Sequence, residues 1–227
     1  MTVLMTLTEI LKSTRLGAAI RLRPVVRLGA AVGAVSVLTA CAIGESATAP
    51  KQLDLGAGVS MDATAAAANT LAQMPPIAVP TANAASLLTE TMVVWRVGDQ
   101  GQPQAYTTYR WVAPPARLVT QRIVDRLSLQ GAVLQQNIGG EVPQLRLNLQ
   151  RFEQTFSPDG SASQAQLTLQ AVLMRGSEVV GQRLINIRVP AVTQDAPGGA
   201  LALRIATDQA AEQVAQWLTS LRTTARR

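Results

Sequence analysis

The chain contains no histidine and a single cysteine, Cys41, among its 227 residues. Imidazole and thiolate groups are the usual ligands of zinc, copper and haem, so sites built from them are excluded. Catalysis by Cys-His or Ser-His-Asp groups is excluded for the same reason. One cysteine also cannot form a disulfide within the chain. We therefore expect neither a metal nor a dissociable cofactor.

Charged residues are few and mixed after residue 40, where 15 Lys and Arg stand against 13 Asp and Glu. Because no block of like charge occurs there, binding of nucleic acid through a basic patch has no support. The carboxylates stand singly, and Lys51 is the only lysine in this part of the chain. These patterns disfavour a carboxylate-pair hydrolase and a Ser-Lys nucleophile, so we expect the protein not to be an enzyme.

Aromatic residues are scarce as well. The chain has two phenylalanines, two tyrosines and three tryptophans, and we expect no large aromatic-lined pocket from so few. Two of the tryptophans, Trp95 and Trp111, and both tyrosines fall in one short stretch. Buried core positions are one interpretation of these tryptophans, and a contact surface is the other.

The first forty residues contain a basic segment and then an apolar run at 28–37. The run is shorter than the ~20 apolar residues that a membrane-spanning helix needs. A basic start, a short apolar middle and a small-residue exit are typical of a secretory signal peptide. The preceding cations are Lys12, Arg15, Arg21, Arg23 and Arg27.

The signal peptide ends at Leu38-Thr39-Ala40-Cys41, which resembles the bacterial lipobox. The resemblance implies that the thiol of Cys41 takes a diacylglycerol, that the chain is cut before Cys41, and that the new amino terminus is acylated. We therefore divide the chain into a lipoprotein signal peptide at 1–40, a lipidated flexible tether at 41–76 and a folded domain at 77–227.

The tether is rich in Ala, Gly, Thr and Pro and poor in large apolar residues. As a flexible coil it would span ~30 Å, and fully stretched it would reach ~115 Å. A short strand at 51–55 is an open alternative, in which that part of the tether docks on the domain.

Alternating apolar and polar residues predict strands at 92–97 and 105–111, joined by a Gly-rich turn, and three long strands near 145–152, 164–173 and 184–189. A phase slip before Phe152 indicates a bulge.

A helix should begin at Pro114-Pro115 and stop at Gly131, and a second should cover 200–222 after a loop at 194–199. The fold class is therefore α+β, with an antiparallel-rich sheet and two amphipathic helices on one face. The expected stripe of the second helix is Leu201, Ile205, Ala210, Val214, Trp217, Leu218 and Leu221.

In order, these pieces resemble the ABC-type transport auxiliary lipoprotein family, which includes the paraquat-inducible protein C type. The segments that carry the resemblance are Leu38–Cys41, Leu53-Asp54-Leu55-Gly56, Met92-Val93-Val94-Trp95-Arg96, Arg110-Trp111, the run 113–122, Leu145-Arg146-Leu147 and the helix around Trp217.

The resemblance implies a periplasm-facing lipoprotein of an ABC-type lipid transport system whose periplasmic component carries mammalian-cell-entry (MCE) domains. Residue 42 is Ala, not the Asp that often retains lipoproteins in the inner membrane of enteric bacteria, so we expect the outer membrane, with the inner membrane as the alternative. The covalent lipid on Cys41 would be the only attached group.

The expected role is that of a tether that docks on the MCE-domain protein. Exposed residues of the hairpin, Tyr106, Tyr109 and Arg110, are the predicted contact residues, because tyrosine and tryptophan are favoured interface anchors; the polar sheet face is the alternative. Two other functions stay open: an outer-membrane lipoprotein that activates a cell-wall synthase or assists outer-membrane assembly, and a direct lipid carrier, which would need an apolar cavity of some hundreds of Å³.

Overall fold

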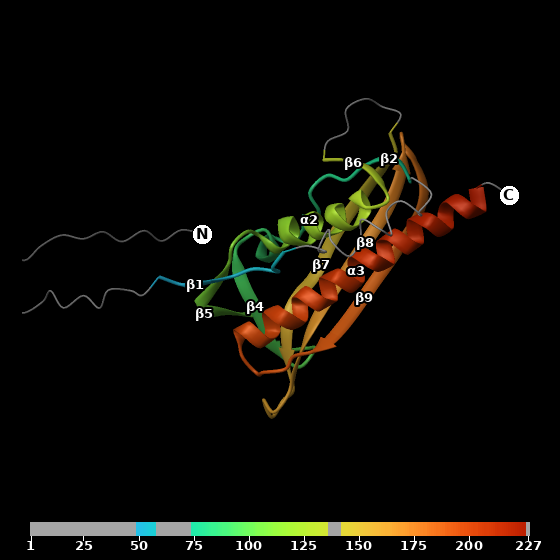
Figure 1. Cartoon of the computed structure of the whole chain (residues 1–227). Helices are drawn as coiled ribbons and strands as arrows, with labels where there is room; N and C mark the ends of the chain where they lie inside the picture. Colours follow the sequence, from blue (N-terminus) through green and yellow to red (C-terminus); the bar gives the residue numbers. More distant parts are fainter. Residues whose placement is uncertain (1–48, 58–73, 136–141, 226–227) are drawn as a thin grey trace, which may run out of the picture. The chain divides into compact units, whose positions relative to one another are not determined.

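The computed structural model describes residues 49–57, 74–135 and 142–225. Within these ranges the chain forms one mixed sheet of nine strands, two α-helices and a short 3-10 helix (Figure 1). The strands are β1 (Lys51–Leu53), β2 (Met74–Ala78), β3 (Asn83–Ala84), β4 (Met92–Val97), β5 (Gln104–Trp111), β6 (Gly131–Leu134), β7 (Gln144–Phe156), β8 (Ser163–Arg175) and β9 (Glu178–Pro190). The helices are η1 (Ser86–Leu88), α2 (Pro115–Ser128) and α3 (Ala196–Ala225).

The prediction of an α+β fold is confirmed, but the sheet is mixed rather than antiparallel-rich. β7, β8 and β9 form a long antiparallel meander, and β4 and β5 form the predicted antiparallel hairpin. The other pairings are parallel: β1 with β5, β2 with β6 and β7, and β3 and β4 with β7. The predicted bulge is present, because the β7–β8 register shifts between Leu149 and Arg151.

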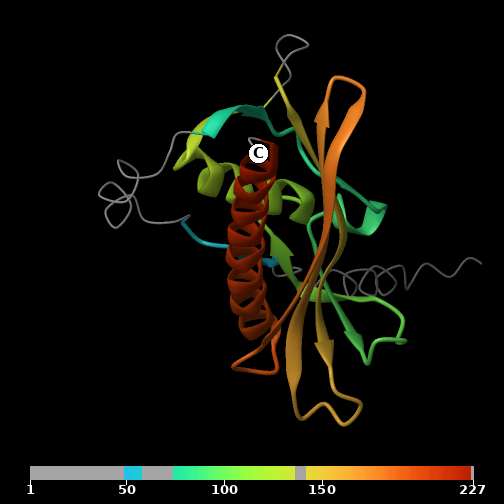
Figure 2. The same cartoon turned by 90° about the vertical axis from the view of Figure 1, so that its right-hand side faces the viewer.

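Both α-helices lie on the same face of the sheet, as predicted, and the edge-on view shows them as one layer (Figure 2). α3 packs on β7, β8 and β9, and α2 packs on α3, β6 and β7. The core between these layers is mainly aliphatic. Its fully buried leucines are Leu127, Leu145, Leu149, Leu167, Leu169 and Leu203.

α3 is longer than predicted, and its buried stripe differs at two positions. The helix begins at Ala196, inside the expected loop. Leu201 and Ile205 are 47% and 40% exposed, whereas Ala202, Leu203 and Ala206 are buried. Small residues therefore form much of the contact between α3 and the sheet. The predicted stripe favoured large apolar residues, so in this part of the helix it was placed on a neighbouring face.

The early start of α3 has a local cause in Asp195. Its Oδ1 accepts hydrogen bonds from the backbone N–H of Gly198 at 2.8 Å and from the Thr193 hydroxyl at 2.6 Å. An aspartate that accepts a backbone N–H of the first turn is a favoured N-cap. The Thr193 hydroxyl and then the Gly198 N–H hold the pKa of Asp195 below its usual value.

Asp195→Ala is expected to lower the free energy of unfolding by about 1 kcal/mol at neutral pH. Because the folded-state pKa is depressed, the carboxylate stabilises the fold above the unfolded-state pKa, and this contribution is lost as the pH falls through the folded-state pKa. Urea unfolding of both proteins at about pH 7 and about pH 3 measures the difference, which should shrink at the lower pH. An equal difference at both pH values would contradict the capping role.

Candidate partner-docking site

The β4–β5 hairpin is irregular, and the irregularity brings its two tyrosines together. The register of the pairing shifts between Met92 and Val94. In a regular strand Tyr106 and Tyr109 would point to opposite faces, because side chains alternate. The structure instead places their rings edge to face, with centroids 6.1 Å apart. A register shift of this kind bends a strand and re-aims its side chains.

The tyrosines continue into a row of aromatic rings that crosses three strands. The ring of Trp95 in β4 lies 6.1 Å from that of Tyr106 and 5.7 Å from that of Phe156 in β7, the second pair being edge to face. Such pairs contribute about 0.5–1.5 kcal/mol beyond the burial of their area. Trp111, by contrast, is buried in the core beside Phe152.

A cleft of about 420 Å³ opens along this row, where β7 turns into β8. We call it the aromatic cleft. Its wall includes Trp95, Val97, Tyr106, Phe156, Pro158 and Asp159. The cleft is open to solvent, and its three aromatic residues, which are distant in sequence, gather at one end of the sheet.

A second cleft, of about 400 Å³, shares Phe156 and Pro158 with the first and extends to the hairpin turn at Asp99. Thr155, which lines it, is 6% exposed, and its hydroxyl has no hydrogen-bond partner among the described residues. The β7–β8 turn thus separates two open clefts, and both have more apolar than polar wall.

The hydroxyl of Tyr106 is held by a chain of hydrogen-bonded polar side chains. Its hydroxyl donates to Oε1 of Gln154 at 2.9 Å, and Nε2 of Gln154 donates to Ser163 at 2.8 Å. Ser163 in turn donates to Gln194 at 3.1 Å. Burial, followed by the negative charge of Asp195, raises the pKa of Tyr106 to about 12. The ring of Tyr106 is therefore fixed in the cleft wall as a neutral phenol.

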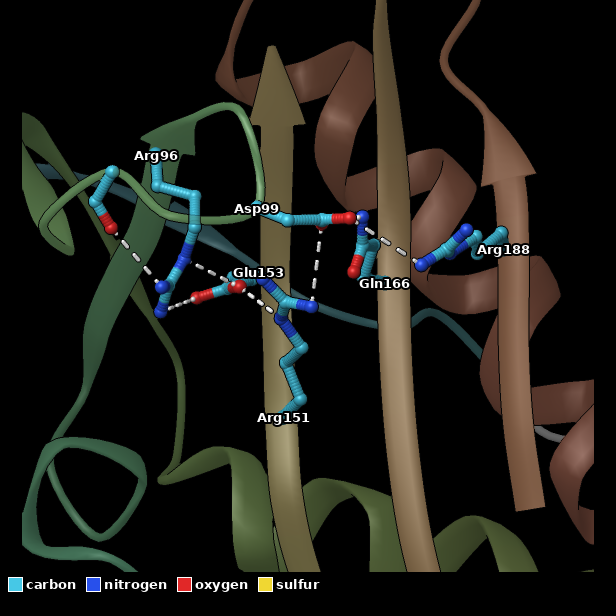
Figure 3. Close-up of polar contacts among 7 residues, drawn as sticks. Arg96, Asp99, Arg151, Glu153, Gln166 and Arg188 are labelled. Atoms are coloured by element: carbon cyan, nitrogen blue, oxygen red, sulfur yellow. Dashed lines mark hydrogen bonds and ion pairs between the residues drawn. The ribbon is translucent and has the colours of Figure 1, made fainter.

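The sheet face opposite the helices carries a ladder of charged residues on β4, β7 and β9, with Gln166 of β8 between them (Figure 3). At its centre is Glu153, whose side chain is only 4% exposed. Nη2 of Arg96 donates to Oε2 of Glu153 at 2.8 Å, and Nε of Arg151 donates to Oε1. Nε of Arg96 also lies 2.7 Å from Oε1, an ion pair by distance but not a hydrogen bond by angle.

The hairpin turn folds over this ladder through Asp99. Its Oδ1 accepts a hydrogen bond from Gln166 at 2.9 Å, and its carboxylate lies 3.4 Å from Arg151 and 3.6 Å from Arg188. The hydrogen bond from Gln166 lowers the pKa of Asp99, and the charges of Arg151, Arg188 and Arg96 lower it further. This end of the polar face is therefore covered by the turn instead of being fully solvated.

Glu153→Gln is expected to lower the free energy of unfolding by about 2 kcal/mol, because hydrogen bonds to charged groups contribute about 1.5–3 kcal/mol. The amide N–H₂ of glutamine would face a guanidinium donor instead of accepting from it. Chemical unfolding measures the change, and Glu90→Gln, at an exposed turn position, is the control. A loss below about 0.5 kcal/mol, in the range of a surface ion pair, would contradict a central role for Glu153.

The N-terminal segment is held by a buried cation, Arg122 of α2, which is 3% exposed. Its guanidinium donates to the carbonyl oxygen of Leu55 at 2.5 Å and to that of Ala57 at 2.6 Å, and its Nε pairs with Asp208 of α3 at 2.9 Å. The side chain of Leu55 is buried. The alternative of a docked strand, left open by the sequence, is thus confirmed, although the strand, β1, covers only Lys51–Leu53 of the expected 51–55 and lies beside β5.

The structure brings the predicted contact residues together near this strand. Lys51 of β1 pairs with Tyr109, and Gln52 pairs with Arg110. Tyr106 and Tyr109 are half-buried, and Nη1 of Arg110 donates to the carbonyl oxygens of both tyrosines at 2.6 and 2.7 Å. Leu38, Thr39, Ala40 and Cys41 lie outside the described residues.

Sequence reasoning missed Arg122 and the clustering of Trp95 with Phe156. The sequence did contain a signal for Arg122, because this charged residue is placed beside the apolar face of the helix. It lies three residues after Val119 and next to Ile123, both of which are on that face. No comparable signal joins Trp95 to Phe156, since the parallel β4–β7 pairing that places them together is long-range.

In the described part of the chain, no group of three or more Asp, Glu, Cys or His residues is arranged to hold a metal ion. No helix within residues 49–57, 74–135 and 142–225 combines the length and the apolar character needed to cross a membrane.

Among solved structures, the fold is similar to that of a Xanthomonas campestris protein assigned to the DUF330 family. The two share 22% identity with a TM-score of 0.58, over 69% of this chain and 95% of that one. A second crystal structure, of an uncharacterized protein, shares 13% identity with a TM-score of 0.57, over 75% of this chain and 99% of that one. At these identities the likeness shows the fold alone. The comparison with curated proteins finds no match.

Residues 59–215 match the family model of the ABC-type transport auxiliary lipoprotein component. The match covers more than half of the chain and includes the aromatic cleft, the charged ladder and Arg122. The chain therefore belongs to the ABC-type transport auxiliary lipoprotein component family.

Proposed function

We propose that this protein is the tether and docking subunit of an ABC-type lipid transport system that links the inner and outer membranes. Acylated Cys41 anchors it in the outer membrane, on the periplasmic side, and the folded domain docks on the MCE-domain component of the transporter. It acts without catalysis. The observation that carries the proposal is the family match over residues 59–215, and Ala42, in place of Asp, supports the outer membrane.

The placement of β1 supports a direct connection between the anchor and the docking surface. β1 is the nearest described strand after Cys41, and it pairs with β5 at Tyr109 and Arg110. A partner bound at these residues would therefore be linked to the membrane anchor through one strand pair. Tyr106 contributes to the same surface through the wall of the aromatic cleft.

Affinity capture of the tagged full chain from solubilised envelope of its own organism tests the proposal, with mass spectrometry of both proteins and lipids. We expect recovery of an MCE-domain protein without stoichiometric lipid. The double variant Tyr109→Ala, Arg110→Ala should reduce recovery at least tenfold, because truncating an interface anchor commonly costs 2 kcal/mol or more. Arg117→Ala, at an exposed position of α2, is the control, and thermal unfolding checks that the variants fold.

Each outcome distinguishes the functions left open by the sequence. Recovery of a cell-wall synthase would replace the tether with an activator, and about one lipid per chain would indicate a carrier. Undiminished recovery by the double variant would remove Tyr109 and Arg110 from the contact surface.

A further inference from the structure

The aromatic cleft has an acidic wall. Among the described residues that line it, Asp159 is the only one with a charged side chain. A second carboxylate, that of Asp195, lies close enough to Tyr106 for its charge to raise the pKa of the hydroxyl. The cleft thus combines three half-buried aromatic rings with nearby negative charge.

Asp159 is fixed in place as a carboxylate. Its Oδ1 accepts hydrogen bonds from the Ser157 hydroxyl at 2.6 Å and the Ser161 N–H at 3.2 Å, and its Oδ2 accepts from the Ser161 hydroxyl at 2.8 Å. The bonds from Ser157 and then Ser161 lower its pKa to about 2. These contacts leave the charge exposed to solvent and do not neutralise it.

The arginines of the charged ladder belong to the opposite face, whereas Arg110 lies beside Tyr106 but is bonded to the backbone carbonyl oxygens of the two tyrosines. Arg96 and Arg151 pair with Glu153, and Arg151 and Arg188 lie near Asp99. Trp95 and Val97 alternate with Arg96 along β4, so their side chains leave the strand on the other side. The second cleft borders this charged face through Asp99, whereas the aromatic cleft does not.

We propose that the aromatic cleft binds an arginine or lysine side chain presented by an extended segment of the periplasmic partner. A cation over the face of tryptophan or tyrosine is attracted by the ring quadrupole, and a nearby carboxylate adds to that attraction. Arginine fits best, because its planar guanidinium both stacks on rings and bonds to a carboxylate. The inference rests on the proposed function for the identity of the partner, but not for the chemistry of the cleft.

The test follows the indole N–H signal of Trp95 by NMR in the full chain carrying Cys41→Ser. The probe is the peptide acetyl-Gly-Arg-Gly-Arg-Gly-amide, and the same peptide with citrulline, which is neutral and nearly isosteric, is its control. We expect a saturable shift of the Trp95 signal with the arginine peptide alone, weakened by added salt. Trp111 and Trp217 are buried, so their signals should not move.

Asp159→Asn should weaken binding about fivefold to tenfold, which corresponds to about 1–1.4 kcal/mol. The asparagine Oδ1 can still accept from Ser157 and Ser161, so the turn should be kept. Asp125→Asn, the same charge change on α2, is the matched control and should not alter binding.

Equal binding of the citrulline peptide, or no saturable shift, would overturn the inference. A shift produced by glycerophosphoethanolamine and not by the arginine peptide would also overturn it, in favour of a lipid headgroup. Failure here combined with capture of an MCE-domain protein would refute the cation site and leave the proposed function standing. Binding here without such capture would refute the function alone.

Discussion

Arg122→Met is expected to lower the free energy of unfolding by about 3 kcal/mol, because removing one partner of a buried, hydrogen-bonded cation leaves the others unsatisfied. Methionine has a similar length but cannot donate to the carbonyl oxygens of Leu55 and Ala57, which Arg122 holds at 2.5 and 2.6 Å. Those carbonyls can regain water only if the segment leaves the domain, and that exposes Leu55 as well. We therefore expect β1 to detach locally, in addition to the global loss of stability.

Local detachment has a specific readout. Lys51 and Lys12 are the only lysines of the chain, and Lys51 lies in β1. A lysine-specific protease should therefore cleave at Lys51 much faster in Arg122→Met than in the unmodified protein, because backbone paired with β5 resists a protease until it opens. Urea unfolding gives the accompanying change in stability.

Asp208→Asn is the matched control for this prediction. Asp208 pairs with the Nε of Arg122, but its side chain is 44% exposed, and the asparagine Oδ1 can still accept from the guanidinium, so its loss should cost less than Arg122→Met. The bonds to Leu55 and Ala57 would remain, and cleavage at Lys51 should stay slow. If Arg122→Met is no more sensitive to the protease than Asp208→Asn, Arg122 does not hold the segment.

The docked strand also changes the expected reach of the anchor. A tether that ran freely from Cys41 to residue 76 would stretch ~115 Å, but the chain is already held at Lys51. Lys51 lies ten positions after Cys41, a stretch that spans at most ~35 Å when fully extended. The Arg122 contacts would therefore set how far the domain can stand from the proposed lipid anchor at Cys41.

Local sequence patterns were sufficient for the regular elements of the fold. The periodicities of α2, of the β4–β5 hairpin and of β7 to β9 each match what the structure contains. The parallel pairings were not predictable in the same way, because they join short strands distant in sequence. β2 contains Pro75 and Pro76. Proline has no backbone N–H to donate to a neighbouring strand, so these residues predicted a flexible tether and not a strand.

The candidate site was predicted less well than the fold. The aromatic residues of the hairpin were recognised as candidates, but their common side depends on a register shift that alternation alone does not reveal. At the N-terminal segment, the run Leu53-Asp54-Leu55-Gly56 was a usable signal that this part of the chain docks on the domain. Gly56 has a φ of +73°, a backbone conformation that favours glycine.

Cys41→Ser is expected to release the protein from the membrane fraction almost completely while leaving the domain folded. A single acyl chain binds a membrane only marginally, and each buried methylene contributes about 0.8 kcal/mol, so the three chains implied at Cys41 would account for firm anchoring. Cell fractionation and mass spectrometry of the N-terminal peptide measure the change. Ala42→Asp is the matched variant: it keeps the thiol and should keep the lipid, but move the protein toward the density of the inner membrane. If Cys41→Ser still sediments with membranes after a high-salt wash, the anchor lies elsewhere. If Ala42→Asp changes nothing, residue 42 does not set the choice of membrane.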